Sequence, residues 1–181
     1  MANICDTRIH FKGEQTALDD LFSKLKTESL RDVAVKFGIT QADIPYDMGF
    51  TRGDIIDIDE KCYEITQNDA WYPRTSIWQA IINKYYKDEL SFVYKAEEPG
   101  SDIYINTDTT RTYFTESFMC DYCVDNEDDT ICFDDEQSLL DWANEKFNAT
   151  AVTVDELRAY MDDYIGDDEY CTIGEYEHEY N

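Results

Sequence analysis

The sequence predicts an α+β protein with an antiparallel sheet and helices on one face of that sheet. Over residues 1–96, segments of alternating polarity and segments of helical periodicity follow in the order strand, helix, strand, strand, helix, strand. This is the order of the split βαβ, or ferredoxin-like, βαββαβ core. Apolar residues make up 43% of the 181-residue chain, which is enough to bury a sizeable core. Residues 97–181 carry most of the excess negative charge.

The first strand and the two helices after it are predicted from periodicity. Residues 4–12 alternate between two faces, one of which carries Cys5, Thr7, Ile9 and Phe11. Thr16 is an expected N-cap for a helix whose apolar residues have helical spacing over 18–25. A second, short helix is expected to begin at Ser29 as its N-cap and to end at Gly38.

A hairpin, a further helix and a fourth strand complete the first part of the chain. Residues 54–59 and 61–67 alternate around a tight connection, which predicts two antiparallel strands. After Pro73, apolar residues at helical spacing predict a helix that includes residues 77–85. Residues 90–95 predict another strand, so we expect one sheet packed against the helices.

The second part of the chain predicts more strands and two more helices. We expect strands over residues 103–106 and 130–133, and one or two strands within residues 111–124. Asp134 with Gln137, and Thr153 with Glu156, have the spacing of capping boxes, and each pair is followed by an amphipathic segment. The short tail after Gly166 is expected to add a strand or to stay loose. We expect these strands to extend the first sheet.

The charge divides the chain into two parts. Residues 1–96 hold 16 acids and 12 bases, whereas residues 97–181 hold 25 acids and 3 bases. The net charge of −26 excludes ordinary binding to phosphate backbones or anionic membranes, which carry the same sign. We therefore expect a ferredoxin-like core over residues 1–96 and an acidic strand-and-helix extension over residues 97–181, packed together as one domain.

Neither a membrane anchor nor an export signal is expected. No segment approaches the roughly 18 uninterrupted apolar residues of a membrane span. The N-terminus lacks a basic region followed by an apolar one. These features predict a cytoplasmic protein, and free thiols are then the expectation for its six cysteines.

Three short motifs resemble one protein family. They are Met1-Ala2-Asn3-Ile4-Cys5, Asp69-Ala70-Trp71-Tyr72-Pro73 and Ala96-Glu97-Glu98-Pro99-Gly100. Together they resemble the YubB-type ferredoxin-like domain of phage and plasmid proteins, best over residues 62–108. Position 4 departs from the pattern, because the family has Trp where this chain has Ile. The resemblance implies a ferredoxin-like fold and a mobile-element setting, and it implies no reaction or catalytic residue.

Patterns for catalysis or metal binding are weak. His10 and His178 have no identifiable nucleophile beside them. Cys120 and Cys123 form a lone C-x-x-C motif, with Cys132 nine residues later, and a zinc site usually needs a second pair. On a strand, Cys120 and Cys123 would also point to opposite faces. We therefore expect no enzymatic activity, no cofactor and no metal site.

The densest acidic cluster, residues 125–129, supports two interpretations. Its spacing echoes an EF-hand loop, but Thr130 stands where the sharp turn of such a loop needs Gly. A solvated hairpin loop is the favoured interpretation. A small metal-dependent enzyme or a cation-binding protein that uses this loop stays as an alternative. A further alternative is an accessory protein of the mobile element whose acidity is incidental.

The acidity of the second part favours a non-enzymatic interaction protein of a phage or plasmid. We expect it to inhibit a host defence protein by imitating the charge of nucleic acid. The expected partner is a basic, nucleic-acid-binding host protein, with neither nucleic acid nor membrane bound directly. Acids at the end of the last helix oppose its dipole, which indicates a use for their charge. The candidate partner-binding residues are Asp125, Glu127, Asp128, Asp129, Asp162, Asp163, Asp167, Asp168 and Glu169.

Overall fold

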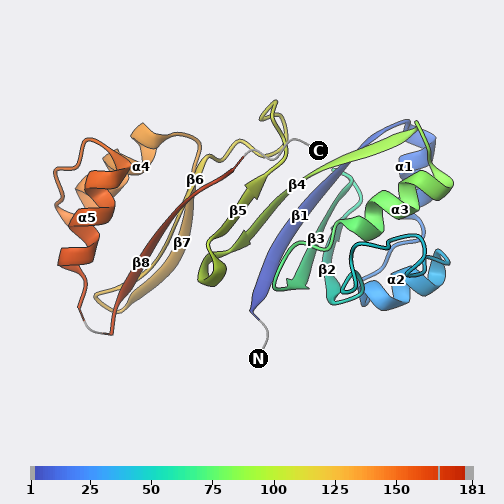
Figure 1. Ribbon diagram of the computed structural model, residues 1–181. Helices are drawn as coiled ribbons and strands as arrows, with labels where there is room; N and C mark the ends of the chain where they lie inside the picture. The colour runs from blue at the N-terminus through green and yellow to red at the C-terminus, as the bar shows by residue number, and fades with distance from the viewer. Residues whose placement is uncertain (1–2, 167, 178–181) are drawn as a thin grey trace.

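The structure, a computed structural model, describes residues 3–166 and 168–177. These residues form two antiparallel sheets and five α-helices. The two sheets face each other, and the helices cover their outer sides (Figure 1). The α+β class that the sequence predicts is confirmed. In the described residues, no helix is long and apolar enough to cross a membrane.

The first sheet has five strands in the order β2-β3-β1-β4-β5, and all neighbours are antiparallel. Its strands are β1 (Ile4–Gly13), β2 (Gly53–Asp59), β3 (Glu64–Ala70), β4 (Leu90–Glu98) and β5 (Ile103–Asn106). The helices on its outer side are α1 (Gln15–Phe22), α2 (Leu30–Lys36) and α3 (Ser76–Tyr85). A short 3-10 turn, η1 (Pro99–Ser101), connects β4 to β5.

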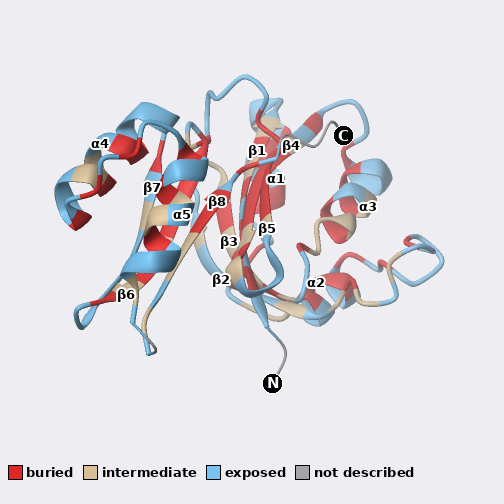
Figure 2. Ribbon diagram, turned by 60° about the vertical axis from the view of Figure 1, so that its left-hand side comes forward, coloured by how far each residue is buried: buried red, intermediate tan, exposed pale blue. Residues whose placement is uncertain are grey.

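The core of the first sheet lies on the face that the alternation predicts. Cys5, Ile9 and Phe11 of β1 are buried and share one apolar cluster with Trp78 of α3. The rings of Phe11 and Trp78 meet edge to face, with 5.5 Å between their centroids. Figure 2 shows buried residues on the first-sheet strands and on the helix surfaces that face them. The predicted inward face of β1 is confirmed.

The helix starts in the first part differ in one place from the prediction. Ser29 caps α2 as expected, and its hydroxyl accepts a hydrogen bond from the amide of Asp32 at 3.2 Å. The prediction that Thr16 caps α1 is wrong, because that helix already begins at Gln15. Glu14 precedes it in extended conformation, and its carbonyl accepts the first helical hydrogen bonds without a side-chain cap.

The second sheet has three strands in the order β7-β6-β8. They are β6 (Phe118–Val124), β7 (Glu127–Phe133) and β8 (Tyr170–Glu175), covered by α4 (Glu136–Phe147) and α5 (Val154–Tyr164) around a separate apolar cluster. The prediction that the later strands extend the first sheet is wrong for all of them except β5. The irregular connector 107–117 leads the chain away from the first sheet before β6 begins.

The helices of the second part begin at side-chain caps. Thr153 caps α5 as predicted and accepts a backbone hydrogen bond at 3.2 Å. The cap of α4 is Asp135, which accepts from the amide of Ser138 at 2.8 Å, so the prediction of Asp134 is wrong by one residue. Asp134 instead accepts a hydrogen bond from the hydroxyl of Thr115 at 2.7 Å, and this contact belongs to the connector.

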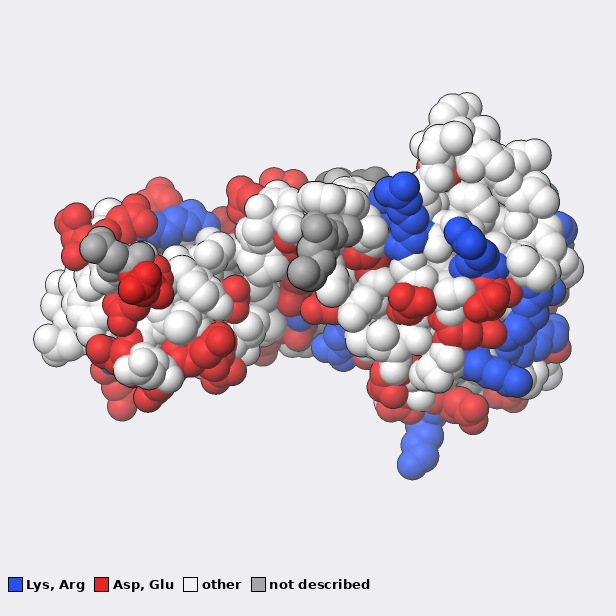
Figure 3. All heavy atoms as spheres, turned by 90° about the horizontal axis from the view of Figure 1, so that it is seen from below, with Lys and Arg blue, Asp and Glu red and all other residues white. Residues whose placement is uncertain are grey.

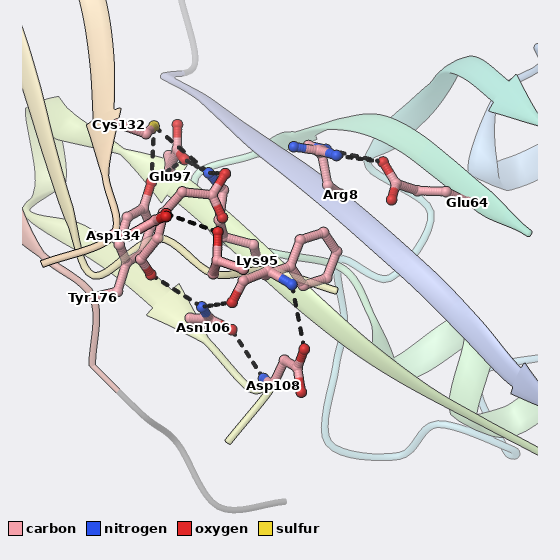
Figure 4. Close-up of polar contacts among 12 residues, drawn as sticks. Arg8, Glu64, Lys95, Glu97, Asn106, Asp108, Cys132, Asp134 and Tyr176 are labelled. Carbon is pink, nitrogen blue, oxygen red and sulfur yellow. Dashed lines mark hydrogen bonds and ion pairs between the residues drawn. The ribbon is translucent and has the colours of Figure 1, made fainter. Parts of the chain in front are cut away.

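A buried lysine joins the two sheets (Figure 4). Lys95 of β4 is 5% exposed, and its ammonium group pairs with Glu97 at 2.9 Å and with Glu116 at 3.2 Å. The ring centroid of Tyr176 lies 5.0 Å from this ammonium, and the Tyr176 hydroxyl donates to Glu97. Burial lowers the pKa of Lys95, but the attraction of the carboxylates outweighs it and raises the pKa. The lysine therefore stays charged inside the interface.

The connector that carries Glu116 is held by hydrogen bonds from Asn106, at the end of β5, and by hydrogen bonds to its own Asp108. The Asn106 side-chain amide donates to the carbonyl of Phe114 at 3.0 Å and to that of Glu116 at 3.2 Å. Asp108 accepts from the backbone amides of Tyr113 at 2.6 Å and Phe114 at 3.2 Å. These bonds place the connector against the inner face of the first sheet, where Glu116 reaches Lys95.

The chain after β8 touches both sheets. The amide of Glu177 donates to the carbonyl of Tyr104 at 2.8 Å, and the amide of Asn106 donates to the carbonyl of Glu177 at 3.0 Å. Gly174 allows a close approach at this point, because a Cβ there would lie 2.2 Å from the Tyr104 ring. The second half is thereby held against the edge of the first sheet.

Candidate acidic interface

Two acidic segments that are distant in the sequence lie side by side in the fold. The backbone amide of Asp125 donates to the carboxylate of Glu169 at 2.8 Å, across 44 positions of the chain. The hydroxyl of Tyr170 donates to Asp128 at 3.4 Å. The acidic tip is defined here as the described acids of the β6–β7 hairpin end, the end of α5 and the loop after α5. They are Asp125, Glu127, Asp128, Asp129, Asp162, Asp163, Asp168 and Glu169.

The turn of the β6–β7 hairpin is shorter than the predicted loop 125–129. Asp125 and Asn126 alone form it, with φ angles of 52° and 65°. Such left-handed pairs form two-residue hairpin turns. Glu127, Asp128 and Asp129 already belong to β7, where successive side chains point to opposite faces. Their carboxylates therefore do not wrap around one point, as the ligands of an EF-hand loop must.

The end of α5 presents carboxylates at the negative end of the helix dipole. Asp162 and Asp163 are exposed, and the last turn contains no basic residue. Such placement typically costs about 0.3–1 kcal/mol per charge. The fold therefore keeps these acids at an energetically unfavourable position, next to the other acids of the tip.

Glu169 has a structural role within the tip. Its carboxylate accepts hydrogen bonds from the backbone amides of Gly166 and Asp125, each at 2.8 Å. These two bonds lower the pKa of Glu169. Glu169 thus holds the two segments together, whereas the other acids of the tip are exposed. Asp167, also a predicted partner-binding residue, lies outside the described residues.

Few basic groups balance the acids of the second half. Lys146 of α4 forms an ion pair with Glu127. Arg158 donates to Asp155 at 3.3 Å and to the carbonyl of Ile173 at 3.0 Å. Figure 3 shows Asp and Glu spread over the second half with little Lys or Arg, whereas both signs lie side by side on the first half. The tip therefore keeps a negative field, which salt screens over about 8–10 Å.

The cysteines of the second half point in different directions. Cys120 and Cys123 diverge, as strand geometry predicts: Cys120 belongs to the core under the helices, while Cys123 lies on the other face of β6. The sulfur of Cys132 on β7 lies 3.7 Å from Nζ of Lys95. Among the described residues, no group of three or more His, Cys, Asp or Glu side chains is placed to hold a metal ion.

His10 packs in the interface between the two halves of the molecule. It lies on the polar face of β1, as predicted, and stacks on Tyr113 of the connector with 3.6 Å between ring centroids. Burial is the main reason that the pKa of His10 is lowered. In the described part of the chain, no hydrogen bond joins His10 to a serine or cysteine. His178 lies outside the described residues.

Asp69 is a buried carboxyl group that sequence reasoning does not identify as a site. Its Oδ2 atom accepts from the hydroxyl of Thr7 at 2.9 Å, the side chain of Gln67 at 2.7 Å and the amide of Arg74 at 2.9 Å. Its Oδ1 atom has no partner among the described residues. Burial raises the pKa of Asp69 to about 6, against the lowering effect of these bonds. Asp69 lies two residues beyond the predicted strand 61–67, and continuing the alternation of Ile65 and Gln67 as far as Asp69 would have placed it on the inward face.

The acidic tip is an open surface. One cavity of about 440 Å³ lies at the end of the first sheet beside Arg52 and Trp71. Another, of about 330 Å³, lies between β5 and β8. Neither is lined by an acid of the tip, so the geometry of the tip fits a macromolecular surface better than an enclosed small molecule.

No protein-family model matches the chain, and neither a curated protein nor a solved structure matches it. Any inference about function therefore depends on the residues and geometry of this protein itself.

Proposed function

We propose that this protein is a non-enzymatic interaction protein whose acidic tip binds a basic surface of a nucleic-acid-binding protein. The observation that carries the proposal is the convergence of two acidic segments, from the β6–β7 hairpin and from the end of α5, through the bond between Asp125 and Glu169. This convergence places acids from both segments on one surface, where a single partner can contact them together.

Electrostatics supports this kind of partner. A negative surface attracts a positive one and accelerates their encounter, most strongly at low salt. Duplex DNA presents one negative charge per about 1.7 Å of its axis, and proteins that bind it expose matching Lys and Arg. The exposed carboxylates of the tip offer charges of the same sign on a hairpin and a helix end. Such an arrangement competes with nucleic acid for the same basic surface.

The proposal extends to the fold family and the biological setting. We propose a ferredoxin-like core over residues 1–96, with residues 97–181 as an acidic extension. The antiparallel order β2-β3-β1-β4, with helices on one side, supports this assignment. The motifs that resemble YubB-type domains support a phage or plasmid origin, and hence a host protein, such as a defence nuclease, as the target.

The test is capture of partners from a nuclease-treated bacterial lysate on the immobilised protein, at low and at moderate salt. The tip variant carries Asp125→Asn, Asp129→Asn, Asp162→Asn and Asp163→Asn, and leaves Glu169 intact because of its structural role. We expect the wild type to retain a nucleic-acid-binding protein that added duplex DNA displaces. We expect the tip variant to retain at least tenfold less of this protein than the wild type does.

A matched control removes the same number of charges elsewhere. Glu14, Asp54, Asp57 and Glu60 are exposed on the first half and make no side-chain hydrogen bond among the described residues. Their replacement by amides should leave retention within about twofold. Equal losses in both variants would mean that total charge, not the tip, is responsible. Undiminished retention by a folded tip variant would contradict the proposal.

A further inference from the structure

Two thiols of the second sheet lie in contact. Cys120 on β6 and Cys171 on β8 have their sulfur atoms 3.6 Å apart. In the β6–β8 register, Cys120 is opposite Ile173 and Cys171 is opposite Tyr122. The two cysteines are therefore diagonal neighbours, and both point toward α4 and α5, because positions two apart on a strand share a face.

The two sulfur atoms are in non-bonded contact and are not yet at bonding distance. A disulfide has a sulfur–sulfur length of about 2.05 Å, so the two atoms need to approach by about 1.5 Å. We propose that Cys120 and Cys171 are a dithiol–disulfide pair, whose oxidation covalently links β8 to β6. This inference is independent of the proposed partner, because it concerns the covalent state of the second half alone.

The surroundings of the two thiols assign them different roles. Cys120 is 1% exposed within the apolar cluster, whereas Cys171 is partly accessible. Their hydrogen bond lowers the pKa of Cys171, while the same contact and burial raise the pKa of Cys120. A thiolate is the attacking species in thiol–disulfide exchange. Cys171 is therefore the residue that reacts first with a disulfide reagent.

A small disulfide such as oxidised glutathione can serve as the oxidant that converts the two thiols into a disulfide. The Cys171 thiolate attacks one sulfur of the reagent, forms a mixed disulfide and releases one thiolate. The Cys120 sulfur then attacks the Cys171 sulfur, loses its proton and releases the second thiolate. The protein loses two protons and two electrons, and the reagent becomes two thiols.

The link closes the loop that carries the acidic tip. The cysteines are 51 positions apart, and β7, α4 and α5 all lie between them. β8 also leads directly to Tyr176 and Glu177, which contact the first sheet. Oxidation therefore restricts unfolding of the whole second half, since a cross-link lowers the entropy of the unfolded chain. Reduction leaves β8 held by non-covalent contacts alone.

The other cysteines provide internal controls. Cys5 is buried in the first sheet, where burial raises its pKa to about 12. Cys62 is exposed on the β2–β3 connection, and Cys123 lies on the opposite face of β6 from Cys120. Cys132 lies on β7 beside Lys95. None of these four sulfur atoms lies within hydrogen-bond distance of the sulfur of another described cysteine. The native fold therefore brings only Cys120 and Cys171 together among the described cysteines.

The test oxidises the native, full-length wild type with oxidised glutathione, blocks the remaining thiols after denaturation and maps the peptides without reduction. We expect a cross-linked peptide pair containing Cys120 and Cys171, with the other four cysteines alkylated. We expect a higher urea midpoint for the oxidised form, which returns to the starting value after reduction. The same treatment of the urea-unfolded chain should give mixed pairings.

Two results would overturn the inference. One is full alkylation of both cysteines after prolonged exposure of the native protein. The other is a native-state pairing of either cysteine with a different one. As a second readout, Cys171→Ser should abolish the rise in the urea midpoint, whereas Cys62→Ser should keep it. Because the primary mapping uses the wild type, failure of a variant to fold leaves that test intact.

Discussion

At the scale of single residues, Asp69 shows how burial sets the behaviour of a charged group. Three hydrogen bonds reach one of its oxygens, yet burial dominates and raises its pKa to about 6 from a usual value of 3.8. Its proton is therefore bound more tightly in the folded chain than in the unfolded one. The stabilisation from this proton is fully present below about pH 3.8 and is lost as the pH rises through about 6.

We expect Asp69→Asn to remove this pH dependence, because the amide does not titrate. As the pH falls from 7 to 4, the free energy of unfolding of the wild type should rise by about 2–3 kcal/mol relative to that of the variant. This magnitude follows from 1.36 kcal/mol per unit of pKa shift. Urea unfolding of both proteins at several pH values measures it. Asp57→Asn, exposed on β2, is the matched control and should show no such trend. A constant difference for Asp69→Asn would contradict the expectation.

At the scale of elements, the two threonines that the sequence offers as helix caps have different roles. Thr153 accepts a hydrogen bond from the amide of Glu156 and precedes α5 in extended conformation. Thr16 lies inside α1, one residue after its start, and is exposed. The difference arises because a cap must have non-helical backbone, and only Thr153 has it.

We expect Thr153→Ala to destabilise the protein by about 1 kcal/mol, through the loss of an N-cap. Thr16→Ala should change the free energy of unfolding by less than about 0.5 kcal/mol, because the exposed side chain caps nothing. Chemical denaturation of both variants beside the wild type distinguishes the two positions. Similar losses for both would show that Thr16 contributes to the start of α1 after all.

At the scale of the whole molecule, charge repulsion opposes the fold. The net charge is −26, and most of it lies in the second half, where Lys146 and Arg158 are already paired. Lys95 belongs to the other half, and its ammonium lies in the junction between two carboxylates. Because salt screens charges separated by more than a Debye length, added salt should relieve the repulsion.

We expect the melting temperature to rise by several degrees between about 10 mM and 300 mM sodium chloride. For a chain of this length, about 1 kcal/mol corresponds to a shift of roughly 2–4 °C. The tip variant defined above should show a smaller rise, since it lacks four of the repelling charges. If the melting temperature of the wild type did not change with salt, the acids would be too far apart to repel one another measurably.

Local sequence patterns predict most of the elements and the inward face of β1. Period-two alternation located β1 and the side of it that carries Cys5, because strand side chains alternate whatever surrounds them. The sequence also located the caps at Ser29 and Thr153, since capping acts between residues three apart. The concentration of acids in the second half, and the divergence of Cys120 from Cys123, likewise follow from local rules.

The meeting of distant segments is visible only in the folded chain. Nothing local shows that the later strands leave the first sheet, because strands of either sheet have the same periodicity. The contact of Asp125 with Glu169, and that of Cys120 with Cys171, each depend on the placing of β8 beside β6. The burial of Lys95 depends on a connector that supplies Glu116. Such contacts join positions many residues apart, and local sequence patterns do not encode that pairing.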